Sequence, residues 1–168
     1  MVALVLSAVI AIASHTSAHA AHSSGQLPPR GVIVPGSVFA GVHLGDTQQK
    51  VQTVWGHHYD VCGYCKDVTW LYEYRGPEPL GAAVRFQKNK VVAVFSLGSP
   101  AGWKTTNGLN MGDPISTVYS QYPRTGTTRC IGFDAITTKI GTSVMAFYSS
   151  AGVIYGFAMV VPKMTVCQ

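Results

Sequence analysis

The chain has 168 residues, of which 47% are hydrophobic and only 11% are charged. This composition excludes intrinsic disorder, because disordered chains combine low hydrophobicity with high charge. The sequence contains no heptad pattern and no apolar run of the eighteen or so residues that a transmembrane helix needs. Its 18 glycines and 9 prolines predict short strands joined by turns.

The N-terminal segment is typical of a secretory signal peptide. Residues 2–13 are apolar except for Ser7, and Ala18-His19-Ala20 offers a small-x-small cleavage site. A buried N-terminal helix is the alternative, since no Lys or Arg precedes the apolar run. We predict a signal peptide over residues 1–20 and a flexible leader over residues 21–37. The mature protein is then secreted or extracytoplasmic, with no stable membrane insertion after cleavage.

Export makes the four cysteines candidates for disulfide bonds. Three pairings are possible, and we favour Cys62–Cys65 with Cys130–Cys167, because the close pair is easily joined and leaves the other two together. The second bond would close a loop of nearly forty residues. The chain-entropy model values such a loop at about 3–4 kcal/mol.

A short motif occurs twice in the chain. The segment Gly41-Val42-His43-Leu44-Gly45-Asp46 is followed, 67 residues later, by Gly108-Leu109-Asn110-Met111-Gly112-Asp113. Apolar residues at helical spacing predict a short helix after each copy. Asp46 and Asp113 are the expected helix N-caps, with Thr47 as an alternative for the first helix.

After each predicted helix the apolar period changes to that of strands. The first copy is followed by predicted strands at 68–74, 82–86 and 91–97. The second is followed by strands at 135–140, 143–148 and 153–161. We therefore predict an α+β fold of two tandem repeats, each a short helix with an antiparallel β-meander. Repeat unit 1 covers residues 38–98, a linker covers 99–107, and repeat unit 2 covers 108–168.

The tandem Gly-x-x-x-Gly-Asp-(Thr/Pro)-x-x-x-Val motif with its meander, over residues 38–161, resembles the β-lactamase-inhibitor-protein fold. The same module occurs singly in outer-membrane assembly lipoproteins of the BamE (SmpA/OmlA) type. The chain departs from that family at Asp46-Thr47 and Asp113-Pro114, where Met then Thr or Ser is usual, and it lacks the lipid-bearing Cys. The resemblance implies that the sheet face and its loops bind other proteins without catalysis.

The segment Cys62-Gly63-Tyr64-Cys65 is similar to the redox site of exported thioredoxin-fold isomerases. In those proteins the first Cys begins a helix, whose N-terminal field activates the thiol. Here residues 66–74 alternate like a strand, which favours a structural disulfide across a turn. An extracellular thiol-disulfide oxidoreductase using Cys62 and Cys65 remains the alternative function.

Other catalytic chemistries find less support. His57 and His58 precede the Cys pair, but no second pair completes a zinc ligand set, so we predict neither metal nor cofactor. Glu73 and Glu78 could form a carboxylate pair, although exposed acids beside a turn are the ordinary case. The sequence lacks a nucleophile-elbow motif and a phosphate-binding glycine pattern, and we expect no enzyme activity.

An aromatic row offers a binding candidate. Alternation along residues 68–74 places Trp70, Tyr72 and Tyr74 on one face of a strand. We favour the arrangement in which charged residues share the other face and these rings pack against the helices, because large aromatic residues usually pack inside. If the parity is reversed, the rings form an open platform for binding. The candidate protein-binding residues are Trp70, Leu71, Tyr72, Glu73 and Arg85.

The net charge of +5 is spread along the chain, and the densest cations are Lys88 and Lys90. This spread lacks the basic stripe of a nucleic-acid-binding protein, so no nucleic-acid partner is expected. Together these features predict an exported, non-catalytic protein-binding module of the cell envelope or exterior. Its protein partner is unknown, and one version of this hypothesis is that the module inhibits that partner.

Overall fold

The computed structural model describes residues 27–75 and 80–167, and the predicted signal peptide lies outside these residues. The larger of its two sheets contains the strands β4 (Asp60–Val61), β5 (Val68–Arg75), β6 (Leu80–Gln87), β7 (Lys90–Leu97), β9 (Gly126–Arg129), β10 (Asp134–Ile140), β11 (Ser143–Ser150) and β12 (Val153–Val160). The smaller sheet contains β1 (Val32–Val34), β2 (Val38–Phe39), β3 (Val42–His43) and β8 (Lys104–Thr105). The helices are α1 (Gln48–Trp55) and α2 (Ser116–Gln121).

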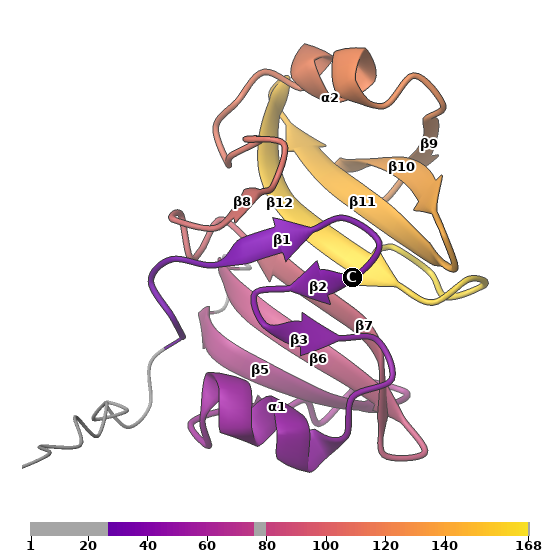
Figure 1. The fold of residues 1–168 in the computed structure, drawn as a ribbon. Helices are drawn as coiled ribbons and strands as arrows, with labels where there is room; N and C mark the ends of the chain where they lie inside the picture. The colour runs from indigo at the N-terminus through magenta and orange to yellow at the C-terminus, as the bar shows by residue number, and fades with distance from the viewer. Residues whose placement is uncertain (1–26, 76–79, 168) are drawn as a thin grey trace, which may run out of the picture.

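The strand order of the large sheet is β4-β5-β6-β7-β12-β11-β10-β9, and that of the small sheet is β3-β2-β1-β8. Figure 1 shows the small sheet lying across one face of the large sheet, with α1 and α2 at opposite ends. We call this covered face of the large sheet the inner face and the opposite face the outer face. The pairing of β7 with β12 joins the first meander to the second in one sheet.

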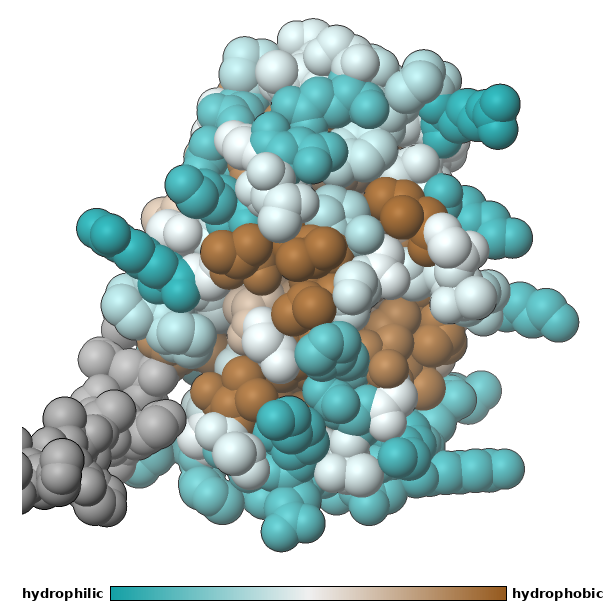
Figure 2. Space-filling view, viewed as in Figure 1, coloured by the Kyte–Doolittle hydropathy of each residue, from teal (hydrophilic) through white to brown (hydrophobic). Residues whose placement is uncertain are grey.

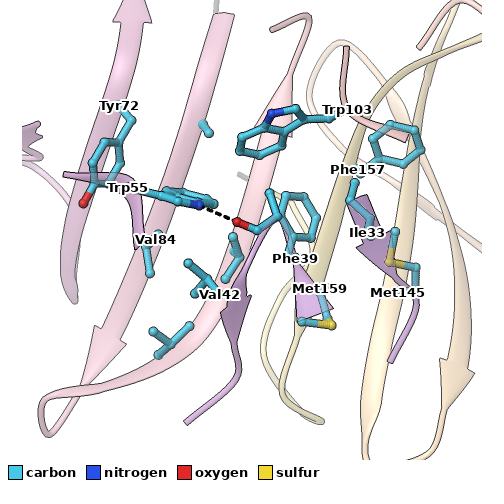
Figure 3. Packing of buried hydrophobic residues seen from close by; sticks show 14 of the residues in the cluster. Ile33, Phe39, Val42, Trp55, Tyr72, Val84, Trp103, Met145, Phe157 and Met159 are labelled. Carbon is cyan, nitrogen blue, oxygen red and sulfur yellow. Dashed lines mark hydrogen bonds between the residues drawn. The ribbon is translucent and has the colours of Figure 1, made fainter. Parts of the chain in front are cut away.

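Large side chains fill the inner face. Trp55 from α1 packs edge-on against Tyr72 of β5, with ring centroids 5.2 Å apart, and its indole nitrogen donates to the Ala40 carbonyl at 2.9 Å. Trp103 lies 5.3 Å from Trp55 and donates its own indole N–H to the Pro28 carbonyl at 2.7 Å. Figure 3 shows these rings between the two sheets. The main core therefore joins segments from both halves of the chain.

The predicted fold class is wrong. The structure is mostly β, with 47% strand and 10% helix, and it has two sheets rather than two tandem helix-plus-meander repeats. The second sheet arises because short apolar pairs such as Val38-Phe39 and Val42-His43 form strands, where the sequence analysis expected the approach to a helix. The helices have eight and six residues, too short to form layers of their own.

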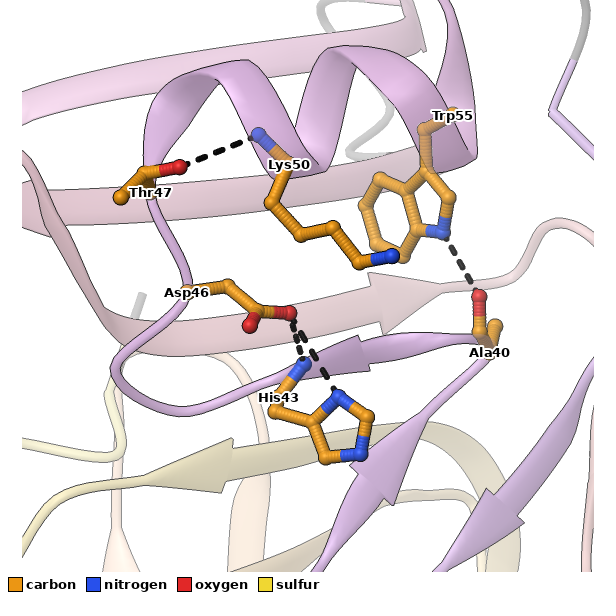
Figure 4. A network of polar contacts seen from close by, with 6 residues as sticks. All are labelled: Ala40, His43, Asp46, Thr47, Lys50 and Trp55. Carbon is orange, nitrogen blue, oxygen red and sulfur yellow. Dashed lines mark hydrogen bonds and ion pairs between the residues drawn. The ribbon is translucent and has the colours of Figure 1, made fainter.

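The twice-occurring motif forms two loops with the same hydrogen bonds. Asp46 accepts from the His43 backbone N–H at 2.8 Å, and Asp113 accepts from the Asn110 backbone N–H at 2.8 Å. Figure 4 shows the first of these contacts, together with the 3.5 Å approach of the His43 ring to Asp46. Each carboxylate closes its loop, and the sequence similarity is a similarity of these loops.

The helix caps differ from the predicted ones. Thr47, rather than Asp46, caps α1, because its hydroxyl accepts from the Lys50 backbone N–H at 3.2 Å. Ile115 precedes α2 with no side-chain cap, so Asp113 does not cap that helix. The two aspartates thus act one or more residues before the helices begin.

Two segments predicted as irregular carry part of the core. Residues 27–37 fall within the predicted leader, yet Leu27 and Ile33 are buried and β1 lies at the centre of the small sheet. The predicted linker contains β8, and its Trp103 is fully buried. Their Pro and Gly residues are typical of flexible connections, but both segments contribute strands to the small sheet and apolar side chains to the core between the two sheets.

Candidate functional site

A groove with a volume of about 730 Å³ lies on the outer face of the large sheet. Most of its lining is apolar or aromatic, and it crosses strands from both halves of the sheet. The lining residues are Cys62, Cys65, Thr69, Leu71, Tyr74, Leu80, Arg85, Phe95, Leu97, Ile131, Gly132, Phe133, Ser150 and Tyr155.

The floor of the groove is hollow around Leu97, because both of its cross-strand neighbours are glycines. Leu97 on β7 lies between Gly81 of β6 and Gly156 of β12 in the strand register. A Cβ at position 81 would approach the Tyr72 carbonyl to 2.6 Å, and one at 156 would approach the Ser96 carbonyl to 2.2 Å. Only glycine fits these close backbone approaches, so neither neighbour of Leu97 contributes a side chain to the floor.

Two irregularities in the strands bring tyrosines to this face. The register of β5 against β6 shifts between Tyr72 and Arg75, and Glu73 has a positive φ of 51°. Tyr74 therefore lines the groove instead of following Trp70 and Tyr72 to the inner face. A second shift, at Tyr148/Ser149 of β11, leaves Tyr155 as an extra residue on β12, and Tyr155 also lines the groove. β-Bulges re-aim side chains in this way at many functional sites.

A disulfide-braced loop forms each wall. The Cys62–Cys65 bond closes the turn between β4 and β5, where the Cys62 N–H also donates to the Thr69 carbonyl at 2.9 Å. The Cys130–Cys167 bond ties the β9–β10 loop to the C-terminal segment, and the Cys130 N–H donates to the Phe133 carbonyl at 2.9 Å. These are the pairs that the cysteine spacing favours.

Each wall loop presents one large apolar side chain to solvent. Tyr64, inside the Cys62–Cys65 turn, and Ile131, next to Cys130, are both fully exposed. Phe133 anchors the second loop, with its ring centroid 5.1 Å from that of Tyr148. Holding exposed apolar groups on covalently braced loops lowers the entropy that binding would cost.

The C-terminal segment covers the remainder of the outer face. Val166 is buried against a patch of alanines, and the Tyr148 hydroxyl donates to the Val166 carbonyl at 2.6 Å. Met164 packs beside this patch, with its sulfur 3.7 Å from a guanidinium nitrogen of Arg85. The groove is therefore the part of this apolar face that the described residues leave open.

The structure separates the five candidate binding residues of the sequence analysis. Trp70 and Tyr72 are buried in the inner core, so they form no aromatic platform. Leu71 and Arg85 lie on the opposite face and line the groove. Glu73 is exposed, and its carboxylate accepts from the Leu27 backbone N–H at 2.9 Å.

Most residues that line the groove were not predicted from the sequence. Phe95, Leu97 and Tyr155 belong to continuous apolar stretches, in which alternation does not distinguish the two faces. Ile131 and Phe133 follow Cys130 in a loop, where a hydrophobic residue between Cys and Gly was the one available signal.

Among the described residues, the side chains considered for metal, redox or carboxylate chemistry do not come together in a site. Residues 27–75 and 80–167 contain no group of three or more His, Cys, Asp or Glu side chains that could hold a metal. Cys62 follows strand β4 and precedes strand β5, rather than beginning a helix as in thioredoxin-like redox sites. Glu78 of the suggested carboxylate pair lies outside the described residues. None of the described helices has the length and apolar character to cross a membrane.

Burial perturbs two tyrosines on the inner side of the molecule. Burial, with a smaller effect of nearby Tyr59, raises the pKa of Tyr72 far above its usual range. Burial also raises the pKa of Tyr122, although a hydrogen bond with Asn107 acts in the opposite direction. Neither tyrosine lines the groove, so these shifts concern the stability of the fold.

The fold is similar to two solved structures. An extracellular protein containing an SCP domain, from Bacillus anthracis str. Ames, matches 71% of this chain with a TM-score of 0.54 and 11% identity, over 44% of its own chain. A cysteine-rich secretory protein from Staphylococcus aureus subsp. aureus Mu50 matches 84% of this chain with a TM-score of 0.52 and 11% identity, over 51% of its chain. The chain spans about half the length of these proteins.

No protein-family model matches the sequence. A search of curated proteins likewise finds no match.

These neighbours correct the family resemblance. The similar structures are SCP-domain and cysteine-rich secretory proteins, not tandem modules of the β-lactamase-inhibitor-protein or BamE type. The glycine motif that carried the resemblance is short, and the structure uses it to close two loops. The predicted location outside the cytoplasm is confirmed by the two disulfides and agrees with the extracellular or secretory neighbours.

Proposed function

We propose that this chain is a non-catalytic extracytoplasmic module that binds a segment of another protein in the outer-face groove. The observation that carries the proposal is an open apolar groove between two disulfide-braced loops, each with a fully exposed hydrophobic side chain. Inhibition of the bound protein is one form that such binding could take.

The size and lining of the groove support a polypeptide ligand. A volume of about 730 Å³ is in the range of small-molecule pockets and holds several side chains. Aromatic residues such as Tyr74, Phe133 and Tyr155 provide large contact areas at a low cost in side-chain entropy. Burying Tyr64 and Ile131 would remove apolar surface from water at about 25 cal/mol per Å².

The rigidity of the walls supports binding rather than a mobile catalytic loop. Each loop is held by a disulfide and by a backbone hydrogen bond: Cys62–Cys65 closes the first loop, and Cys130–Cys167 ties the second to the C-terminal segment. Among the described residues, none of those that line the groove is a His, Asp or Glu, which are the usual general bases. In this proposal the Cys62–Cys65 bond is a wall of the groove and not a redox centre.

Site-specific photo-crosslinking tests the proposal. A photo-reactive residue replaces Ile131 in one protein and Val32, on β1, in a matched control. Val32 is also a large exposed hydrophobic residue, with 52% of its surface accessible, but it lies on the small sheet. Figure 2, viewed as in Figure 1, shows several apolar patches on the side of the molecule where the small sheet lies.

Each protein is incubated with the envelope and secreted fractions of the source organism. We expect a discrete polypeptide adduct at position 131 and none at position 32. Unlabelled wild-type protein should compete with the adduct, whereas the Ile131→Glu protein should not. Equal adducts at both positions, or no adduct at 131, would count against the groove as the binding site.

A further inference from the structure

Strand β9 forms one edge of the large sheet. It pairs with β10 through Arg129 opposite Asp134 and Gly126 opposite Thr137, and among the described residues no strand pairs with its other side. All four residues of β9 are exposed. The opposite edge, β4, has only two residues, one of them the acidic Asp60. β9 is therefore the longer of the two open edges of this sheet.

The strand register shows which backbone groups of β9 face the open side. The Cys130 N–H donates to the Phe133 carbonyl at 2.9 Å, in continuation of the β9–β10 pairing. Hydrogen-bonded and non-hydrogen-bonded pairs alternate in an antiparallel ladder, so the backbone of Thr128 faces β10 and those of Thr127 and Arg129 face away from it. The extended backbone of another strand presents donors and acceptors that match this alternation.

This edge is held in place at both ends. Just before β9, the Thr138 hydroxyl donates to the Arg124 carbonyl at 3.1 Å. Just after β9, the Cys130–Cys167 disulfide fixes the next residue of the chain. An added strand would meet an edge that is already ordered, which lowers the entropy that binding costs.

The charges around β9 favour an acidic partner. Continuation of the β9–β10 register places Lys139 opposite Arg124, and neither forms an ion pair with a carboxylate of the described residues. Arg129 ends the strand, with its Nε 3.7 Å from Oδ1 of Asp134. Residues 122–140 contain these three cations and one carboxylate. This excess of cations repels a second copy of the same edge and attracts acidic side chains.

We propose that β9 binds an extended, acidic segment of another protein, which adds to the large sheet as a further antiparallel strand. The antiparallel direction continues the order of this sheet. The backbone of the segment pairs with Thr127 and Arg129, and its Asp or Glu side chains lie near Arg124 and Lys139. The inference concerns a surface other than the groove, so it goes beyond the proposed function and does not depend on it.

A display library of extended peptides tests the chemistry of the partner. Val, Ile or Thr occupies every second position, the other positions are randomised, and the target is the Leu71→Trp protein, in which a large ring covers the groove floor. We expect enriched peptides to carry Asp or Glu. Exchanging each acidic residue for its amide should weaken binding about two- to fivefold, as measured by fluorescence anisotropy. Enrichment of neutral or basic peptides would overturn the acidic partner.

Two proline variants test whether these peptides bind β9. Thr127→Pro removes an outward N–H and leaves the bonds from β9 to β10 in place. Val61→Pro is the matched control on β4, because the Cys62 N–H donates to the Thr69 carbonyl and the register turns the Val61 backbone outward. We expect a loss of about tenfold or more for Thr127→Pro and a change within about twofold for Val61→Pro. Equal losses, or no loss in Thr127→Pro, would overturn the site.

The Thr127→Pro protein also separates edge ligands from groove ligands. Peptides that are selected against the wild-type protein and keep their affinity for Thr127→Pro bind elsewhere, and these peptides are the ones used to measure the groove variants.

Amide hydrogen exchange of the wild-type protein gives a reading that does not depend on the folding of a variant. An edge peptide should slow exchange at Thr127 and Arg129 about tenfold or more, and should change Thr128 less, because that amide already faces β10. Unchanged exchange at Thr127 and Arg129 would overturn the proposal. Protection that rises with the concentration of the protein itself, without peptide, would also overturn it, because a second copy would then be the occupant.

A pair of charge variants assigns the acidic preference to this edge. Arg124→Gln should reduce the effect of exchanging the acidic residues of the peptide for amides. Lys50→Gln, on α1 at the opposite end of the molecule from α2, is the matched control and should leave that effect unchanged. Equal reductions in the two variants would show an effect of net charge alone and would overturn the proposed contact.

Discussion

The two faces of the large sheet are built from the same strands but differ in side-chain size and in what covers them. The inner face carries Trp70, Tyr72 and Phe157, and two helices and a second sheet cover it. The outer face carries five buried alanines among larger residues such as Phe95 and Tyr148, and among the described residues the β9–β10 loop and the short C-terminal segment pack on it. Large covered residues stabilise the fold, while small residues on the other face leave apolar surface open for a partner.

The largest effect is expected for a truncation between the two sheets. Trp103→Ala should lower the free energy of unfolding by about 3–5 kcal/mol, because it leaves a cavity and removes the hydrogen bond to Pro28. Leu71→Ala, on the half-exposed outer face, should cost about 1–2 kcal/mol. Urea denaturation of both variants checks the contrast, and a greater loss for Leu71→Ala would reverse our assignment of the stabilising face.

The two disulfides are expected to contribute unequally to the free energy of unfolding. Replacing Cys130 and Cys167 with Ser opens a loop of 37 residues and should cost about 3–4 kcal/mol by chain entropy. It also releases the C-terminal segment from the outer face. Replacing Cys62 and Cys65 opens a loop of 3 residues and should cost about 2 kcal/mol. Thermal denaturation of the two double variants measures the losses. We expect the larger fall in Tm when Cys130 and Cys167 are replaced, and a larger fall on replacing Cys62 and Cys65 would contradict this order.

High pH should destabilise the inner face. Because burial raises the pKa of Tyr72, the folded state keeps the phenol proton that the unfolded state loses above about pH 10. The contribution of Tyr72 to the free energy of unfolding is therefore expected to be constant below that pH and to fall as the pH rises beyond it. Tyr72→Phe should reduce this slope in urea titrations between pH 8 and 11; an unchanged slope would show that Tyr72 is not the titrating group.

The smallest effect on stability, with a large effect on binding, is expected at the groove walls. Tyr64→Ser and Ile131→Ser change fully exposed side chains, so the free energy of unfolding should move by less than about 0.5 kcal/mol. Binding of a peptide selected by display against the immobilised wild-type protein should nevertheless weaken about tenfold. A stability loss comparable with that of Leu71→Ala would mean that these residues support the fold.

Local patterns predicted much of the large sheet but not the architecture. Alternation placed Trp70 and Tyr72 against the helices, and the strands predicted at 82–86 and 91–97 pair as β6 and β7 around a turn with Lys88 and Asn89 at positive φ. The small sheet escaped prediction because its strands have two or three residues each, below the length at which a period is visible. Their pairing depends on contacts between distant segments, such as β1 with β8.

The groove escaped prediction for a different reason. Strand alternation assumes an unbroken register, and the bulge in β5 moves Tyr74 to the face opposite Tyr72. The bulge in β12 does the same for Tyr155. Leu71 and Arg85, two of the five candidates, lie on the outer face because alternation holds up to their positions, whereas the hollow around Leu97 depends on glycines in neighbouring strands.

Filling the groove with a large side chain tests whether the outer face of the large sheet is the binding site. Leu71→Trp places a large ring over the floor, and Val34→Trp places the same ring on the exposed side of β1. The affinity of a peptide selected by display against the immobilised wild-type protein is measured for both variants and for the wild type. We predict a loss of about tenfold or more for Leu71→Trp and a change within about twofold for Val34→Trp. Unchanged binding by Leu71→Trp, or equal losses in the two variants, would contradict the assignment of binding to the outer-face groove.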